Sequence, residues 1–426
     1  MKTKTLMASL ATTTALFIAP ALAQDCPVKV GVLHSLSGTM AISETTLKDT
    51  VLMLVEQQNA KGGLLGCEIE AVVVDPASDW PLFAEKAREL LTVSEVDVIF
   101  GSWTSVSRKS ALPVLEELNG LMFYPVQYEG EESSKNVFYT GAAPNQQAIP
   151  AVDYFLEELG VESFALLGTD YVYPRTTNNI LDAYLKSKGI ADEDIFVNYT
   201  PFGHSDWATI VSDVVALGAS GKQVGVISTI NGDANVGFYK ELAAQGVDAA
   251  DIPVVAFSVG EEELSGLDTA PLVGHLAAWN YFQSADTEIN AEFVEAWKAY
   301  AGEERVTNDP MEAHYIGFNM WVNAVTEAGT TDVDAVRAAM WGQEYPNLTG
   351  GTAVMNANHH LSKPVLIGEI RDDGQFDIIS QTAEVPGDAW TDHLPESAPL
   401  KSDWKELGCG MYNTETGTCV QMTSNY

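Results

Sequence analysis

Basic residues are scarce in this chain, which has 22 Lys and Arg against 59 Asp and Glu among its 426 residues. The formal net charge is therefore −37, and the few basic residues form no cluster. Nucleic-acid binding needs a basic patch, so no nucleic-acid partner is expected. The acidic residues are spread along the whole chain, which indicates a solvated acidic surface rather than a dedicated cation site.

Long apolar runs are also missing, apart from a short one at the start. Met1–Lys4 is basic, residues 6–18 are mostly apolar, and Ala21-Leu22-Ala23 is a small-x-small cleavage motif. This pattern predicts a secretory signal peptide over residues 1–23, because its apolar part is too short to span a bilayer. The mature protein is therefore expected to be soluble, periplasmic and not embedded in a membrane.

Cysteine is rare as well, with four residues in the chain. Cys26 precedes a predicted strand at 28–33, and Cys67 precedes a second at 68–74. If these strands are parallel neighbours, the two thiols lie at one edge of the sheet, where a disulfide is possible. The alternative is that all four thiols are reduced and buried. The second predicted disulfide would close a small loop near the C-terminus, between Cys409 and Cys419.

The motifs of common enzymes are absent. There is no G-x-S-x-G elbow, and segment 218–223 has the wrong glycine spacing for a phosphate loop. The adjacent His359 and His360 have no nearby Cys or fixed acidic partner, so no metal site is predicted. Ser35 and His34 are adjacent as a possible nucleophile and base, but neighbours on a strand face opposite ways. No catalytic residue or cofactor is therefore expected, and an exported amide hydrolase is a disfavoured alternative.

Strands and helices alternate along most of the chain. The first series has strands at 28–33, 69–74, 96–100 and 121–123, with helices at 43–59, 80–91 and 104–118. The second has strands at 163–167, 195–198, 224–228 and 254–257, with helices at 146–159, 176–188, 207–217 and 234–245. Repeated strand–helix–strand units predict parallel, doubly wound sheets, and two series predict two lobes with a cleft between them. A late hairpin at 365–379 precedes a weakly periodic tail, residues 386–426.

Two polar stretches follow strands of the first series. Gly101–Lys109 and Phe123–Gly130 contain aromatic rings, hydroxyls and an amide, but no obvious catalytic base. Ligands of open α/β sheets bind beyond the carboxyl ends of parallel strands. These residues therefore favour holding a small polar molecule over transforming it.

Several motifs together resemble the urea-transport substrate-binding proteins of bacterial ABC systems, over nearly all of the mature chain up to about residue 380. The matching segments are 101–105, 123–130, 141–147, 170–175, 228–233, 259–264, 275–282 and 307–315. The resemblance implies a type I periplasmic binding protein with a hinge, monomeric, which delivers its ligand to membrane permease subunits. It implies one lobe from residues 24–144 and about 281–355, and a second from 145–280 and about 356–385.

A related group, the cytoplasmic amide-sensing regulators, implies specific ligand contacts. By position, Trp103 replaces an aromatic residue of that group, Ser105 keeps a hydroxyl and Tyr124 keeps a tyrosine. Tyr171 and Tyr173 match a tyrosine pair of the second lobe, whereas Val126 departs from a threonine.

Urea is flat, neutral and small, so its recognition needs donors, acceptors and stacking surfaces. We expect the Ser105 hydroxyl and the backbone N–H groups that open the helix at Thr104 to donate to its oxygen. Trp103 and Tyr171 would cover the two faces of urea. The acceptors for its N–H groups would be Gln127, Asp233 or one of the glutamates 261–263, of which we select Glu262. Asp233 and the glutamates have an alternative role at helix starts. Short amides and branched-chain amino acids are the alternative ligands, and a glutamate of 261–263 could supply the anionic partner that the ammonium of an amino acid needs.

Overall fold

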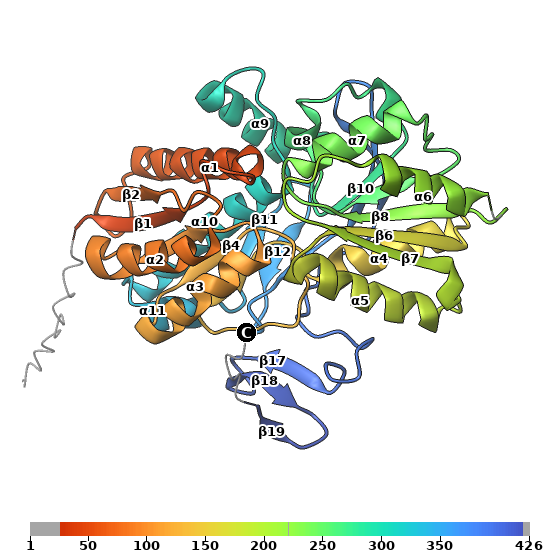
Figure 1. The fold of residues 1–426 in the computed structure, drawn as a ribbon. Helices are drawn as coiled ribbons and strands as arrows, with labels where there is room; N and C mark the ends of the chain where they lie inside the picture. Colours follow the sequence, from red (N-terminus) through yellow and green to blue (C-terminus); the bar gives the residue numbers. More distant parts are fainter. Residues whose placement is uncertain (1–25, 220, 421–426) are drawn as a thin grey trace, which may run out of the picture.

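The computed structural model describes residues 26–219 and 221–420, so the predicted signal peptide lies outside the described residues. Two lobes stand side by side (Figure 1). The first is built on a parallel sheet with strand order β2-β1-β3-β4-β5. Its strands are β1 (Val28–Leu33), β2 (Ile69–Val74), β3 (Val98–Gly101), β4 (Met122–Tyr124) and β5 (Val137–Tyr139).

Helices cover both faces of this sheet because its strands are apolar on both sides. One face packs against α2 (Trp80–Glu89) and α3 (Ser105–Leu118) through Phe83, Ala87 and Leu115. The other face packs against α1 (Ala41–Ala60), α10 (Asp309–Ala328) and α11 (Val333–Met340). This doubly wound arrangement confirms the fold class predicted for the first series.

The second lobe has the strand order β15-β14-β10-β9-β8-β6-β7, in which the strands from β10 to β7 are parallel. The strands are β6 (Ser163–Thr169), β7 (Ile195–Thr200), β8 (Val224–Thr229), β9 (Val254–Ala256), β10 (Leu276–Trp279), β14 (Leu366–Ile370) and β15 (Phe376–Gln381). The helices are α4 (Ala148–Glu157) and α5 (Val172–Ser187) on one face, with α6 (Ala208–Gly218), α7 (Ala234–Ala244) and α8 (Glu261–Leu264) on the other. The predicted late hairpin is the antiparallel pair β14–β15.

The chain passes between the lobes at three places, and one side chain ties them together. The Asn280 amide donates to the carbonyl oxygens of Gln146 at 3.1 Å and Pro364 at 2.7 Å. Asn280 follows β10, Gln146 follows β5, and Pro364 follows β13 (Leu361–Lys363). A small sheet lies beside these crossings, with strands β11 (Glu344–Pro346), β12 (Thr352–Met355), β13 (Leu361–Lys363) and β16 (Val385–Pro386). The remaining helix, α9 (Glu288–Ala301), follows the crossing at Asn280 and contacts α1.

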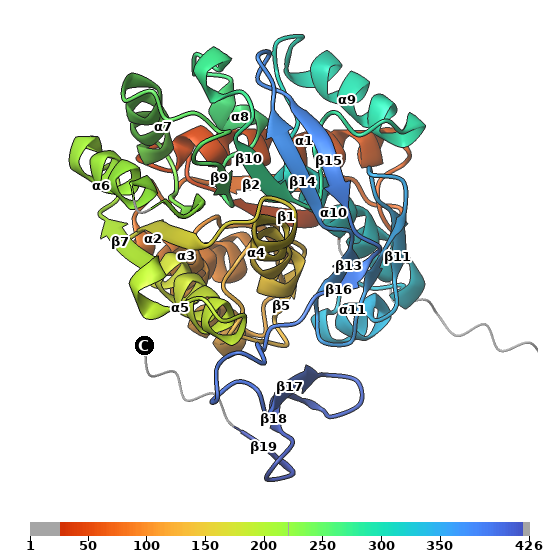
Figure 2. The ribbon, with the colours of Figure 1, turned by 90° about the vertical axis from the view of Figure 1, so that its right-hand side faces the viewer.

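The C-terminal segment is more ordered than the weak periodicity predicts. Strands β17 (Leu400–Asp403), β18 (Cys409–Asn413) and β19 (Thr418–Cys419) form an antiparallel sheet that projects from the lobes (Figures 1 and 2). Strands this short carry too few residues for a periodic signal. A disulfide joins Cys409 to Cys419, with Cα atoms 6.0 Å apart. The second disulfide joins Cys26 to Cys67 at a Cα separation of 5.4 Å, so both predicted pairs are confirmed.

Helix α5 begins at Val172, four residues before the predicted start. Pro174 lies in its first turn, where the missing N–H of proline needs no partner. As a result Tyr171 is the N-cap residue and Tyr173 belongs to the helix.

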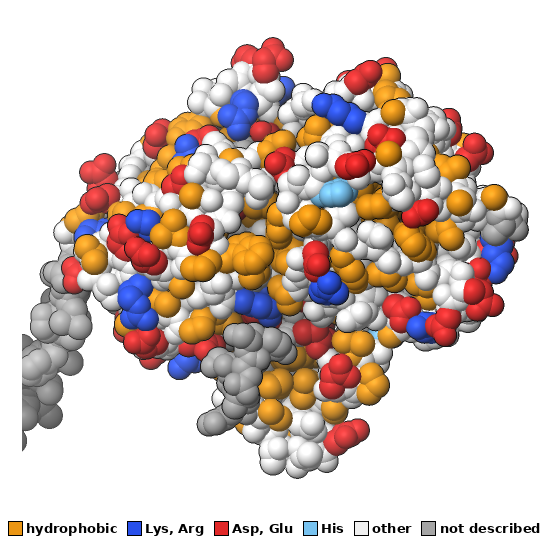
Figure 3. All heavy atoms as spheres, viewed as in Figure 1, with side chains coloured by type: hydrophobic (Ala, Val, Ile, Leu, Met, Phe, Trp, Pro, Cys, Tyr) orange, Lys and Arg blue, Asp and Glu red, His pale blue; other side chains and the backbone are white. Residues whose placement is uncertain are grey.

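Acidic side chains are dispersed over the face of the molecule seen in Figure 3, with fewer basic ones among them. This agrees with the predicted solvated acidic surface. Among the described residues, no helix is long and apolar enough to cross a membrane.

Candidate functional site

The candidate site begins where β3 and β4 end. Ser102 follows β3 with a left-handed φ of 65°, and Trp103 and Thr104 lead into α3. Thr104 is the N-cap residue, because its side chain accepts the N–H of Ser107 at 3.2 Å. This turn places Trp103 and Ser105 beside Tyr124, the last residue of β4, and all three side chains are buried.

The hydroxyl groups of Ser105 and Tyr124 both donate their protons to other groups of the protein. Ser105 Oγ donates to Glu129 Oε2, and Tyr124 Oη donates to the carbonyl oxygen of Trp103. Glu129 belongs to the second polar stretch, but it was not predicted as a site residue. Its contact with Ser105 joins the two stretches directly.

A neutral group of four charged side chains lies behind Ser105. Arg108 Nε is 2.7 Å from Glu132 Oε1, and Lys109 Nζ is 2.8 Å from Glu132 Oε2. Glu129 Oε1 lies 3.7 Å from Arg108 and 3.5 Å from Lys109. Burial would raise the pKa of Glu132, but Arg108 and Lys109 lower it to about 2. Because two cations balance two anions, this group offers no net charge to a ligand.

The second lobe contributes aromatic side chains at the start of α5. The Tyr171 ring lies 4.9 Å from the Phe202 ring and 6.2 Å from the Tyr173 ring, measured between centroids. Burial, together with the neighbouring phenols of Tyr124 and Tyr173, raises the pKa of Tyr171. The tyrosines predicted from the two lobes therefore meet across the cleft.

Hydrogen bonds across the cleft hold the lobes in a closed arrangement. Trp103 Nε1 donates to Asn231 Oδ1 at 3.3 Å, and Gln127 Nε2 donates to Ser258 Oγ at 2.6 Å. Asn231 and Ser258 follow β8 and β9, so both lobes present the carboxyl ends of their strands to the cleft. This is the position expected for ligands of parallel sheets, and the same rule could have identified both residues from the sequence.

Two predicted ligand contacts lie elsewhere. Asp233 is exposed at the N-cap position of α7 without a side-chain capping bond, and Asn231 occupies the cleft instead. Glu262 faces Arg305 at 3.7 Å. Consecutive helical residues point about 100° apart, so a run of three glutamates does not reveal which one faces the cleft.

The other two glutamates of this run are buried and engaged with the protein. Glu261 Oε1 accepts the N–H of Gln283 at 2.7 Å, and Glu263 Oε1 accepts from Ser43 of α1, also at 2.7 Å. The bond from Ser43 is a third link between the lobes. Each glutamate of this run therefore has a partner within the protein.

Several polar atoms at the cleft are buried without a hydrogen-bond partner among the described residues. They include Gln127 Oε1 and Tyr173 Oη. Burial raises the pKa of the Tyr173 hydroxyl above its ordinary value, although the neighbouring Gln127 and Ser258 side chains partly oppose this rise. Buried polar atoms are nearly always paired in native proteins, so unpaired ones gathered at a cleft suit a polar ligand.

The residues considered for chemistry have structural surroundings. Ser35 Oγ accepts the N–H of Ser78 at 3.0 Å, whereas His34 lies 3.1 Å from Glu44, so this serine and histidine form no nucleophile–base pair. His359 and His360 are buried and stack on Phe138 and Tyr139. Within the described part of the chain, no group of three or more His, Cys, Asp or Glu could hold a metal ion.

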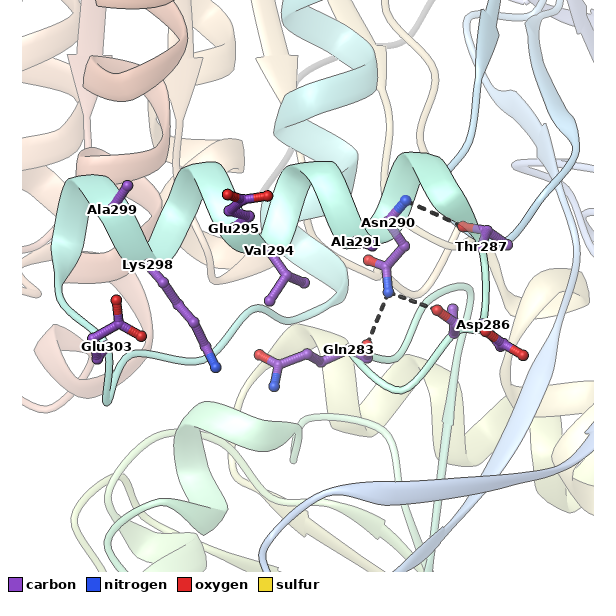
Figure 4. Close-up of a pocket in the computed structure, with 11 residues that line it drawn as sticks. Gln283, Asp286, Thr287, Asn290, Ala291, Val294, Glu295, Lys298, Ala299 and Glu303 are labelled. Atoms are coloured by element: carbon purple, nitrogen blue, oxygen red, sulfur yellow. Dashed lines mark hydrogen bonds between the residues drawn. The ribbon is translucent and has the colours of Figure 1, made fainter.

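A separate hollow of about 600 Å³ runs along α9 (Figure 4). At one end of the hollow, the Asn290 side-chain amide donates to the carbonyl oxygen of Gln283 at 2.9 Å. Lys298 and Glu303 extend from the other end of the hollow (Figure 4). Because much of its lining is exposed and of mixed charge, this hollow is less suited to a small ligand than the interlobe cleft.

The burial of Glu263 beside Ser43 of the other lobe predicts that ligand affinity depends on pH. Burial raises the pKa of Glu263 from 4.5 to about 7, although Ser43 and the Gly260 N–H oppose that rise. Closure of the lobes therefore favours protonated Glu263. The contribution of this proton to the stability of the closed form is complete below pH 4.5 and is lost as pH rises through about 7. Titrations should give an affinity up to about tenfold weaker at pH 8 than at pH 6. Glu263→Gln should flatten this dependence and Glu262→Gln should retain it; an unchanged profile in Glu263→Gln would contradict the assignment.

Comparisons with known proteins agree with this architecture. The family model described as periplasmic binding protein domain matches residues 28–396. Leu/Ile/Val-binding protein homolog 7 of Brucella melitensis is 24% identical over 351 residues, covering 78% of this chain and 85% of that protein. A limonene hydroxylase of Geobacillus stearothermophilus is 32% identical over 134 residues, but the match covers only 24% of that protein.

Solved structures share the fold at low identity. A solute-binding protein of an ABC transporter from Rhodopseudomonas palustris BisB5, in complex with 3,4-dihydroxybenzoic acid, superposes with a TM-score of 0.72 at 18% identity, covering 84% of this chain and 97% of that chain. A leucine-binding protein from Thermotoga maritima gives a TM-score of 0.69 at 17% identity, covering 83% and 98%. With two lobes whose parallel sheets meet at their strand ends, the chain belongs to the periplasmic binding protein domain family.

Proposed function

We propose that this protein captures urea, or a similarly small and uncharged amide, between its lobes in the periplasm and delivers it to the membrane permease of an ABC transporter. The observation that carries the proposal is the chemistry of the cleft. The side chains that meet there are neutral, namely Trp103, Ser105, Tyr124, Gln127, Tyr171, Tyr173, Asn231 and Ser258.

The charge balance of the cleft supports an uncharged ligand. A carboxylate or an ammonium that loses its water needs an opposite charge, because burying an unpaired ion costs several kcal/mol. The nearest charges, on Arg108, Lys109, Glu129 and Glu132, already compensate one another. The structures of the same fold named for leucine binding and for 3,4-dihydroxybenzoic acid concern ligands that carry charged groups, so this cleft favours a different ligand from theirs.

The distance between the lobes supports a small ligand. The bond from Trp103 to Asn231 and the bond from Gln127 to Ser258 bring the two walls into direct contact at two points. Urea has four heavy atoms, and the best very small ligands gain about 1.5 kcal/mol per atom, about 6 kcal/mol in total. The corresponding dissociation constant is some tens of μM, roughly 40 μM.

Isothermal titration of the purified mature protein tests the proposal. Urea should bind near one to one, with a dissociation constant of about 10–100 μM. Leucine and benzoate serve as the comparison ligands, because they represent the two charged classes bound by proteins of the same fold. Heat from leucine or benzoate together with silence towards urea and acetamide would refute the proposal.

A further inference from the structure

The direction of two hydrogen bonds determines what the first-lobe surface offers a ligand. A carbonyl oxygen has no proton, so the Tyr124 hydroxyl must be the donor in its bond to Trp103. A carboxylate is likewise acceptor-only, so Ser105 must donate to Glu129, which Arg108 and Lys109 hold in place. A hydroxyl has a single proton, and once that proton is donated the oxygen can only accept.

Gln127 adds a third acceptor to this surface. Its Nε2 donates to Ser258 at 2.6 Å, while its Oε1 is buried without a partner. The first lobe therefore offers three acceptor oxygens, on Ser105, Tyr124 and Gln127, and neither hydroxyl retains a proton for a ligand. The Ser105 oxygen has two lone pairs, of which one accepts from Arg108 Nη1 at 3.5 Å and the other is left for a ligand. This differs from the role expected from sequence, in which Ser105 donates to the urea oxygen.

We infer, on the basis of the proposed function, that the Ser105, Tyr124 and Gln127 oxygens recognise the N–H groups of the ligand and that Glu129 is a positioning residue that makes Ser105 an acceptor. The ligand class is then ureas and primary amides, with affinity rising with the number of N–H groups. Their carbonyl oxygen is left to other donors, namely the Tyr173 hydroxyl and the backbone N–H groups that open α3. A carboxylate is rejected because its lone pairs would face the lone pairs of the protein.

An isosteric ligand series tests the inference on the unmodified protein. Urea, acetamide and acetone share one carbonyl and nearly one shape, but they carry four, two and no N–H bonds. Each replacement of NH₂ by CH₃ leaves buried acceptors unpaired, so titration should show at least about a tenfold loss of affinity per step. Acetate should bind more weakly than acetamide. Acetone or acetate binding as tightly as acetamide would overturn the inference.

Variants separate the role of Glu129 from a general effect on folding. In Glu129→Gln the amide can donate to Ser105, which frees the serine proton, so the ratio of urea affinity to acetamide affinity should fall several-fold. Ser105→Ala removes the acceptor and should lower the same ratio even if Glu129→Gln fails to fold. Ser110→Ala is the matched control, because Ser110 lies on the same helix and donates to the Val106 carbonyl at 2.8 Å. An unchanged ratio in Ser105→Ala would overturn the inference.

Failure of the proposed function looks different from failure of the inference alone. If urea and acetamide give no heat while leucine or benzoate does, the proposed function is refuted and the inference falls with it. If urea binds but acetone binds equally well, the proposed function stands. Only the inference that the Ser105, Tyr124 and Gln127 oxygens recognise ligand N–H groups is then refuted.

Discussion

Arg108→Met should destabilise the protein by about 3–5 kcal/mol, the cost typical of breaking a buried ion pair from one side. Arg108 is fully buried, and its guanidinium lies 4.4 Å from the ring centroid of Tyr124 and 4.8 Å from that of Tyr128. Its removal leaves Lys109 alone to balance Glu129 and Glu132, two carboxylates that are also buried. Denaturant unfolding followed by circular dichroism measures the loss.

Arg88→Met is the matched control for this prediction. Arg88 Nη2 lies 2.6 Å from Glu117 Oε2, but both side chains are largely exposed, at 45% and 60%. Exposed ion pairs contribute about 0–1 kcal/mol, so this variant should unfold almost like the wild type. Equal losses in the two variants would mean that burial does not control the strength of these pairs. The cluster would then be a poor candidate for the support that holds Glu129 against Ser105.

Gly232→Ala should weaken urea binding about tenfold or more by obstructing closure of the lobes. Gly232 lies in the loop that also carries Asn231, and it faces the first lobe just before α1. A Cβ at this position would stand 2.7 Å from the Thr39 carbonyl oxygen and 3.0 Å from Met40 Sδ. The new methyl group therefore collides with the other lobe in the closed arrangement, and a tenfold loss corresponds to about 1.4 kcal/mol. Titration with urea measures the effect.

The positive φ of this glycine needs its own control, because alanine in the left-handed region costs about 1–2 kcal/mol. Gly246 has a φ of +69°, close to the +67° of Gly232, but nothing lies within 4 Å of a Cβ added there. Gly246→Ala should therefore lower thermal stability to a similar extent and leave urea affinity unchanged. Retention of wild-type affinity by Gly232→Ala would show that the lobes need not approach this closely to bind ligand.

The sequence predicted the elements of the site better than their roles. Trp103, Ser105, Tyr124, Gln127, Tyr171 and Tyr173 meet at the cleft, because residues that follow parallel strands converge whatever the details of packing. Asn231, Ser258, Glu129 and Phe202 were missed as site residues. Asn231 and Glu129 stand within predicted motifs, but only their neighbours in space distinguish them from Asp233 and Glu131.

The amino-acid sequence alone determined the alternation of strands and helices, the proximity of Cys26 to Cys67 and the chemical types gathered at the strand ends. Those features follow from local periodicity and from the geometry of parallel sheets, which any chain with this pattern shares. Tertiary structure decided which glutamate reaches the other lobe and which way the protons of Ser105 and Tyr124 point. These depend on partners tens or hundreds of residues away, Glu129 for Ser105 and Ser43 for Glu263, and no spacing in the chain encodes the direction of a hydrogen bond.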